Sequence, residues 1–252
     1  MKKNSQSIDA LVLITNRQLL KGDISLDLYG QALSRCIERL KQNTKYVIDN
    51  NQGNNFLTSR VDTVQEDSWM RNFTKLFTLC RDTDLLFEEY LQLCDTIGST
   101  VVYHGKVITN REHLDIVLAK AKRIHLPTNL IRYWQSEQEE LWITLQQHFQ
   151  DITVWSTVHN EDDIALLEVL QIPNLEQVLI SPIYPTACKE GHSGIGVSRG
   201  EKLLKQIQAE YPHVQGIALG GIHEHNYQQC LQHSFTGVAI MSDFMKHVHR
   251  KI

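Results

Sequence analysis

Short apolar runs alternate with segments of helical spacing along most of this 252-residue chain. Consecutive apolar residues predict buried strands at 11–15, 75–83, 100–105, 123–127, 152–155, 178–180, 215–222 and 235–244. Apolar residues three or four positions apart predict amphipathic helices at 27–40, 87–98, 134–149, 164–170, 198–210 and 223–233. Because strands and helices alternate, we expect a parallel sheet covered by helices.

Residues 42–73 depart from this alternation. The runs KYVID (45–49) and FLTSRV (56–61) have strand character, and the polar, turn-rich segment NNQGNN joins them. We therefore expect a hairpin, inserted between the first helix and the second strand. An alternative register makes 45–49 the second strand itself. The insertion is either a lid or partner-binding element, or a decoration of the fold.

The stretch 178–197 joins a buried strand to a long polar loop. Thr186 and Lys189 bring a hydroxyl and a cation, and the glycines at 191, 194 and 196 let the backbone approach a ligand. A loop of this kind at the carboxyl end of a parallel strand is typical of ligand binding. The alternative is an ordinary strand-to-helix connection. Asn160 and Ser198 are expected to cap the helices that follow them.

The last two predicted strands end in Gly220-Gly221 and Met241-Ser242. Glycine-rich strand ends followed by helices suit a phosphate held by backbone N–H groups and a helix dipole. In a (β/α)8 barrel, the loops after strands 7 and 8 are the usual phosphate site. No repeat or linker divides the chain. The fold class expected is therefore α/β, a single (β/α)8 TIM barrel over 1–252, with an insertion at about 42–73.

Three of these segments resemble one family. The segments SPIYPTACK, GIALGGI and GVAIMSDF are similar, in order and spacing, to motifs of the thiamin phosphate synthase/TenI superfamily. The loop CKEGHSGIGV looks more like the TenI branch, the thiazole tautomerases, than the synthase branch. The similarity extends over 101–244 and is weaker towards the start of the chain.

The resemblance also shows where this chain departs from the synthases. Arg81 falls on the family arginine, but Thr83 replaces the lysine that binds diphosphate. His104-Gly105 stands where the synthases have an Asn-Asp pair, and Asn129 is nearest to a second magnesium-binding acid. Magnesium prefers carboxylate and other hard oxygen ligands. The substitutions argue against an efficient synthase, although Asp82, Asp84 and Asp115 are candidate substitutes for the missing acids.

The resemblance implies a role for individual residues. His159 matches a family histidine and would be the acid/base, the alternative being a histidine bonded to a backbone carbonyl. Arg81 would bind a substrate carboxylate, the alternative being a salt bridge at the rim. The remaining substrate-binding candidates would hold the phosphate end of the ligand: Thr186, Lys189, Gly220, Gly221, Met241 and Ser242.

The function implied is that of a TenI-like protein of thiamin biosynthesis. It would bind a thiazole phosphate and tautomerise thiazole carboxylate phosphate as an isomerase, with no metal or other cofactor. One alternative is a synthase that couples hydroxymethylpyrimidine diphosphate to thiazole phosphate with Mg²⁺. Another is a non-catalytic relative that binds thiazole phosphate or has a regulatory role.

Composition narrows the partners. The net charge of −4 does not indicate a basic face that would bind nucleic acid. No apolar run approaches the ~20 residues of a membrane span. Five cysteines without a C-x-x-C pair, and scattered histidines, fit free thiols in a reducing cytoplasm and no zinc site. Residues 1–10 read as a polar tail, not a signal peptide. The expected partner is a small molecule, and a homodimer is left open.

Overall fold

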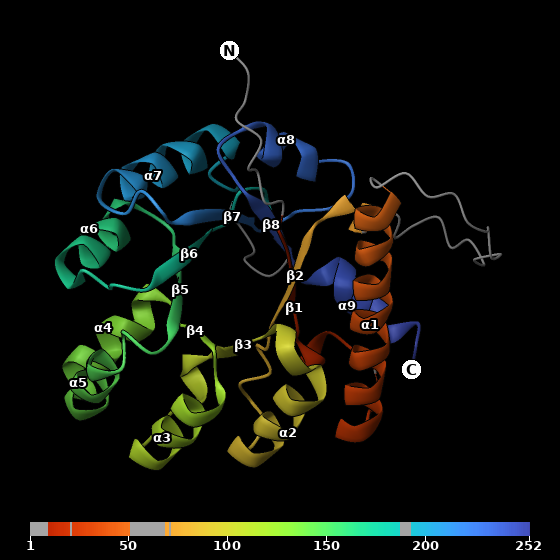
Figure 1. The fold of residues 1–252 in the computed structure, drawn as a ribbon, viewed down its shortest axis with the longest axis horizontal. Coiled ribbons are helices and arrows are strands. Elements are labelled where there is room, and N and C mark those ends of the chain that lie inside the picture. The colour runs from red at the N-terminus through yellow and green to blue at the C-terminus, as the bar shows by residue number, and fades with distance from the viewer. Residues whose placement is uncertain (1–9, 21, 51–68, 71, 187–192) are drawn as a thin grey trace.

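A computed structural model describes residues 10–20, 22–50, 69–70, 72–186 and 193–252. Eight strands form a closed, all-parallel barrel in which each strand pairs with its neighbours in sequence, and the last pairs with the first (Figure 1). The strands are β1 (Ala10–Ile14), β2 (Lys75–Leu79), β3 (Val101–His104), β4 (Arg123–His125), β5 (Thr153–Val158), β6 (Leu175–Ile180), β7 (Gln215–Leu219) and β8 (Gly237–Ile240). The expected single (β/α)8 barrel is confirmed.

Helices surround the barrel and connect consecutive strands (Figure 1). The α-helices are α1 (Leu26–Asn50), α2 (Phe87–Ile97), α3 (Arg111–Lys120), α4 (Thr128–Glu137), α5 (Glu139–Gln147), α6 (Glu161–Leu170), α7 (Val197–Glu210), α8 (Tyr227–Gln232) and α9 (Ser242–His249). Short 3₁₀ turns are η1 (Arg17–Leu19), η3 (Gly98–Thr100) and η4 (Gly105–Val107). No helix among the described residues is long and apolar enough to cross a membrane.

Two apolar layers follow from the two-residue period of the strands. In β1, Val12 and Ile14 point into the barrel, while Leu11 and Leu13 pack outward against the helices. The interior is filled by large side chains, and the rings of Phe77 and Trp155 meet edge to face at 5.0 Å between centroids. A filled interior leaves the strand ends as the place for a ligand.

Two helix starts test the expected caps. Asn160 caps α6, since its side chain accepts a hydrogen bond from the backbone N–H of Asp163, as predicted. The prediction for Ser198 is wrong: α7 begins one residue earlier, and its N-cap is Gly196, with no side-chain cap. Gly196 has φ +77°, a conformation that glycine adopts without strain.

Two predicted elements differ from the structure. The single helix expected at 134–149 is two helices, because the backbone at Gln138 (φ −143°, ψ 49°) leaves the helical conformation between α4 and α5. Residues 45–49 are not a strand but the last part of α1. Apolar residues at 37, 40, 47 and 48 keep helical spacing, so the short apolar run extends the helix instead of starting a hairpin. The second half of the proposed hairpin, 56–61, lies outside the described residues.

The segment before β2 is anchored by aromatic side chains. Trp69 and Phe73 are buried, and their rings lie 4.8 and 5.7 Å from that of Tyr227 on α8. The side-chain amide of Asn72 donates to the Tyr227 hydroxyl at 3.2 Å. The end of the proposed insertion therefore packs against the helix that follows β7.

Cys36, Cys80, Cys94 and Cys230 are buried and form no disulfide among the described residues, and Cys188 lies outside these residues.

Candidate active site

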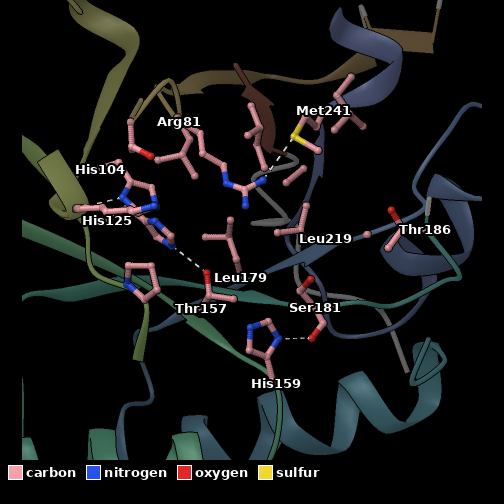
Figure 2. A pocket seen from close by; sticks show the side chains of 18 of the residues that line it. Arg81, His104, His125, Thr157, His159, Leu179, Ser181, Thr186, Leu219 and Met241 are labelled. Carbon is pink, nitrogen blue, oxygen red and sulfur yellow. Dashed lines mark hydrogen bonds between the residues drawn. The ribbon is translucent and has the colours of Figure 1, made fainter. Parts of the chain in front are cut away.

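A cavity of about 1100 Å³ opens at the carboxyl ends of the strands (Figure 2). Its floor is apolar and includes Leu79, Leu179 and Leu219 from the tops of three strands. Seven of the eight residues predicted from sequence line it: Arg81, His159, Thr186, Gly220, Gly221, Met241 and Ser242. Lys189, the eighth, lies outside the described residues. Parallel strands bring these segments together because all their carboxyl ends face one side of the barrel.

His159 directly follows β5 and is held through both its backbone and its ring. Its backbone N–H donates to Asp163 Oδ2 at 2.8 Å, and its ring Nδ1 lies 2.5 Å from the carbonyl oxygen of Ser181. A carbonyl can only accept, so Nδ1 carries the proton. The neutral ring therefore keeps an unprotonated Nε2, and no described residue hydrogen-bonds to that atom. His159 can therefore bond to the backbone carbonyl of Ser181 and still act as a base through Nε2.

Asp163 fixes the position of His159. Besides the His159 N–H, its carboxylate accepts from Thr128 Oγ1 and Arg132 Nη1, both at 2.7 Å. Burial by itself disfavours the charge, but the Arg132 hydrogen bond and then the other two outweigh it and lower the pKa of Asp163. The carboxylate is thus ionised at neutral pH. It ties the start of α6 to α4 and to the residue after β5.

Two further histidines, from β3 and β4, lie side by side across the cavity (Figure 2). The rings of His104 and His125 are 5.0 Å apart and nearly perpendicular. Burial, followed by the charges of Arg81 and Lys106, lowers the pKa of His104 to about 3. Burial, followed by the charge of neighbouring His104, lowers the pKa of His125 well below its ordinary value. Both rings are therefore neutral near pH 7.

His125 also contacts β5. Its Nε2 lies 2.7 Å from Thr157 Oγ1, while its Nδ1 is buried without a hydrogen-bond partner among the described residues. His125 therefore lies in the wall of the cavity and bonds to the neighbouring strand.

Arg81 extends from the end of β2 towards the cavity (Figure 2). Its Nη1 lies 3.6 Å from the sulfur of Met241, and it forms no ion pair with any carboxylate of the described residues. The rim salt bridge that was the alternative for Arg81 is therefore not seen in this part of the chain. Lys106, in the turn after β3, also lines the cavity. Sequence reasoning missed Lys106, although a cation two residues beyond a strand end was a usable signal.

The glycines after β7 have conformations that exclude other residues. Gly220 and Gly221 have φ of +100° and +65°. A Cβ at Gly220 would lie 2.8 Å from Pro182 Cα, and one at Gly221 would lie 2.4 Å from the carbonyl oxygen of Pro185. Part of the need for glycine thus comes from packing against the loop after β6. Ser242, another of the residues that line the cavity, is the first residue of α9. The first N–H groups of this helix have no partner inside the helix.

The candidate substitutes for the missing acids do not assemble at the cavity. Asp82 is buried beneath it and accepts from the Arg17 backbone N–H and from the Tyr29 hydroxyl. Asp115 pairs with Arg111 at 2.8 Å on the surface, and Asp84 does not line the cavity. Over the described ranges, no group of three His, Cys, Asp or Glu side chains is arranged to hold a metal ion.

The position of one missing acid is also filled. Gly105 is buried, and a Cβ there would lie 2.6 Å from Leu126 Cδ2. An aspartate could not enter without displacing Leu126. The side chains of His104, Gly105 and Lys106 also carry no oxygen, so the residues at this strand end do not fit magnesium.

Fold and cavity together define a TIM-barrel protein with a cavity at the carboxyl ends of its strands, where proteins of this fold bind ligands. The family model described as thiamine monophosphate synthase matches residues 77–244, two thirds of the sequence. The chain belongs to this family, the thiamin phosphate synthase/TenI superfamily. A comparison with curated proteins gave no match.

Solved structures share the fold at low sequence identity. The thiamine phosphate pyrophosphorylase from Pyrococcus furiosus is 13% identical, with 98% of each chain covered and a TM-score of 0.48. The thiamine phosphate pyrophosphorylase from Bacteroides thetaiotaomicron is 15% identical, with 94% of this chain and 85% of that one covered and a TM-score of 0.49. The FeFe-hydrogenase maturase HydG from Carboxydothermus hydrogenoformans is 9% identical, with 92% and 59% covered and a TM-score of 0.53. At such identities the likeness concerns the fold alone.

Proposed function

We propose that this protein is a TenI-like enzyme of thiamin biosynthesis that tautomerises a thiazole carboxylate phosphate. The observation that carries the proposal is the Nδ1 contact of His159 with the Ser181 carbonyl. It orients the ring and leaves Nε2 as an unprotonated nitrogen at a cavity lined with anion-binding groups. A proton transfer needs a positioned base of this kind.

The phosphate of the substrate would occupy the side of the cavity formed by Gly220, Gly221 and Ser242. The start of α9 offers backbone N–H groups and the positive end of its dipole there. Met241, at the N-cap of α9, and Thr186 line the adjoining wall. Lys189, which lies outside the described residues, is the cation that the sequence offers for this phosphate.

One residue, His159, can both remove the proton from the substrate and return it. His159 Nε2 takes a proton from one atom of the substrate, and the bond electrons left behind are delocalised through the ring and its carboxylate. The imidazolium keeps its Nδ1–H bond to Ser181 O, which stabilises the cation. Nε2 then returns the proton to a different atom, and the thiazole becomes aromatic. Arg81 would hold the substrate carboxylate with its planar fork of donors.

The family name favours a second candidate, the synthase that couples hydroxymethylpyrimidine diphosphate to thiazole phosphate. That reaction expels pyrophosphate and uses Mg²⁺ to hold it. Two observations count against this candidate. An acid at residue 105 would have to displace Leu126, and the Asp82 carboxylate already accepts a hydrogen bond from the Tyr29 hydroxyl. A non-catalytic binder of thiazole phosphate is the third. In every case we propose a cytoplasmic protein that binds a small molecule, and a homodimer remains open.

The test is titration calorimetry with thiazole carboxylate phosphate, with the ring tautomer followed by NMR. We expect the wild type to bind and isomerise it, and His159→Gln to bind with similar affinity but isomerise about 10²- to 10⁴-fold more slowly. His213→Gln is the matched control, because His213 is exposed and does not line the cavity. Binding without isomerisation by the wild type would contradict the tautomerase and direct attention to the diphosphate with Mg²⁺.

A further inference from the structure

The cavity has a second polar side, formed by the ends of β2 and β3, from which Arg81 reaches to within 3.6 Å of the Met241 sulfur on the glycine-rich side. Arg81 and Lys106 both line it, and neither makes an ion pair with a carboxylate of the described residues. Arg81, His104 and Lys106 all line the same cavity, and Lys106 lies two residues beyond His104 in the turn after β3. Two cations at one end of a cavity, without a protein counter-charge there, are suited to an anionic group of a ligand.

His104 adds a directed donor to these cations. Its Nδ1 accepts the backbone N–H of Lys106 at 3.1 Å, so Nδ1 is unprotonated and the neutral ring carries its proton on Nε2. The side chain is 93% buried, lines the cavity, and its Nε2 has no partner among the described residues. Because His104 lines the cavity, its Nε2–H is available to donate to an atom of a ligand there.

The packing around η4 holds this donor in place. The backbone N–H of His104 donates to the Tyr90 hydroxyl at 2.7 Å. Gly105 lets the turn pack directly on Leu126 of the neighbouring segment. The ring of His104 is further confined by the His125 ring. Its orientation therefore depends on the fold and not on a ligand.

We propose that Arg81, Lys106 and His104 form a second anion subsite, which binds the carboxylate of a substrate whose phosphate lies at the glycine-rich side. The inference rests on the proposed function and deepens it, because it assigns Lys106 and His104 to the recognition of carboxylated over uncarboxylated substrates. Figure 2 shows Leu179 between His125 and Leu219, where a flat, apolar ring would lie on the floor of the cavity.

A carboxylate suits this subsite better than a diphosphate does. Arg81 offers a planar pair of donors that matches two coplanar oxygens, and His104 offers one more N–H. A diphosphate normally brings a divalent cation that needs oxygen ligands, and the side chains of His104, Gly105 and Lys106 carry no oxygen that could hold one. Lys106 supplies the remaining positive charge without a metal.

The test compares two ligands that differ only in the carboxylate: thiazole carboxylate phosphate and thiazole phosphate. We expect the wild type to bind the first about 10- to 100-fold more tightly in calorimetry. Lys106→Met should lower that ratio about tenfold and leave the affinity for thiazole phosphate unchanged. Lys202→Met is the matched control, because Lys202 is exposed on α7 and does not line the cavity. An equal effect of Lys106→Met on both ligands, or no effect, would overturn the inference.

His104 is tested in the unmodified protein by ¹⁵N NMR, so that a folding defect of a variant cannot decide the result. We expect the Nε2 resonance of His104 to shift when the carboxylated ligand binds. Thiazole phosphate should cause only a small fraction of that shift. His104→Gln, which keeps an N–H donor, should retain more of the carboxylate preference than His104→Phe. An Nε2 resonance that responds equally to both ligands would contradict the role of His104.

The inference and the proposed function can fail separately. Selective, Lys106-dependent binding of the carboxylated ligand without isomerisation supports the subsite and contradicts the tautomerase. Isomerisation with no change of the ligand ratio in Lys106→Met supports the tautomerase and contradicts the subsite. Lys106-dependent binding of the pyrimidine diphosphate with Mg²⁺, in preference to the carboxylated ligand, would overturn both.

Discussion

His159 and Ser181 are linked across two neighbouring strands, because the ring Nδ1 of His159 lies 2.5 Å from the main-chain carbonyl of Ser181, just after β6. The contact fixes which nitrogen carries the proton. Across the cavity, His104 has the opposite arrangement, since its Nδ1 accepts the N–H of Lys106. One histidine therefore presents a lone pair on Nε2 and the other presents a proton.

This difference gives a prediction about tautomers. At pH 8, ¹⁵N–¹H correlation spectra of the histidine rings should show His159 protonated on Nδ1 and His104 protonated on Nε2. The physical reason is that a carbonyl accepts only and a backbone N–H donates only. Single variants, His159→Gln and His104→Gln, assign the two signals. A mainly Nε2-protonated His159 would remove the base from the proposed mechanism.

Stability should fall as the pH drops from about 6.5 towards 4.5. His104 and His125 have folded pKa values below the ordinary 6.5, so in this range the unfolded chain binds protons that the folded protein does not. Their contribution is fully present above pH 6.5 and is lost below it, by about 1.4 kcal/mol per pH unit for each histidine. Urea unfolding at a series of pH values measures the slope. His104→Gln should flatten it, while His213→Gln, an exposed control, should change it little.

Gly221→Ala should weaken ligand binding and destabilise the protein by about 3 kcal/mol, through strain at positive φ together with overpacking. Its Cβ would meet the carbonyl oxygen of Pro185 at 2.4 Å and push the loop after β6 away. Gly98→Ala is the control, since Gly98 has φ +76° but open space around its Cβ. It should cost only about 1 kcal/mol. Thermal unfolding and calorimetry with thiazole phosphate measure both effects, and equal losses for the two variants would contradict the packing argument.

Trp69→Ala should destabilise the protein by about 3–5 kcal/mol, the range for truncating a large buried aromatic side chain. Trp69 is 6% exposed, and its ring lies against Tyr227 on α8. Val169→Ala, at an 82% exposed position of α6, should stay within about 0.5 kcal/mol of the wild type. Denaturant unfolding measures both. A small loss for Trp69→Ala would mean that the segment before β2 contributes little to the fold.

The sequence predicted well where a local pattern and a family motif agreed. The strand-helix alternation predicted the barrel, and the eight strands lie where apolar runs indicated them, within a few residues. The glycine pair at 220–221 and the polar residues after β2, β5 and β8 were found in the same way. Strand ends of a parallel barrel converge by construction, so motifs far apart in sequence could be assigned to one site.

The prediction failed where local patterns were ambiguous. The apolar run at 46–48 fits a strand as well as a helix turn, and the continuation of α1 decided the outcome. Lys106 was missed because a lone lysine after a strand has no motif. Its relevance depends on the Arg81 and His104 side chains, which other parts of the fold bring to it.

The sequence by itself determined the barrel, the family and the identity of the groups around its mouth, because these depend on periodicity and on short motifs. Only the tertiary structure decided what each group can do there. It placed a carbonyl on Nδ1 of His159 and a backbone N–H on Nδ1 of His104, and it left Arg81 without a carboxylate among the described residues. Tautomer, burial and charge pairing depend on neighbours from other strands, and a linear pattern does not contain them.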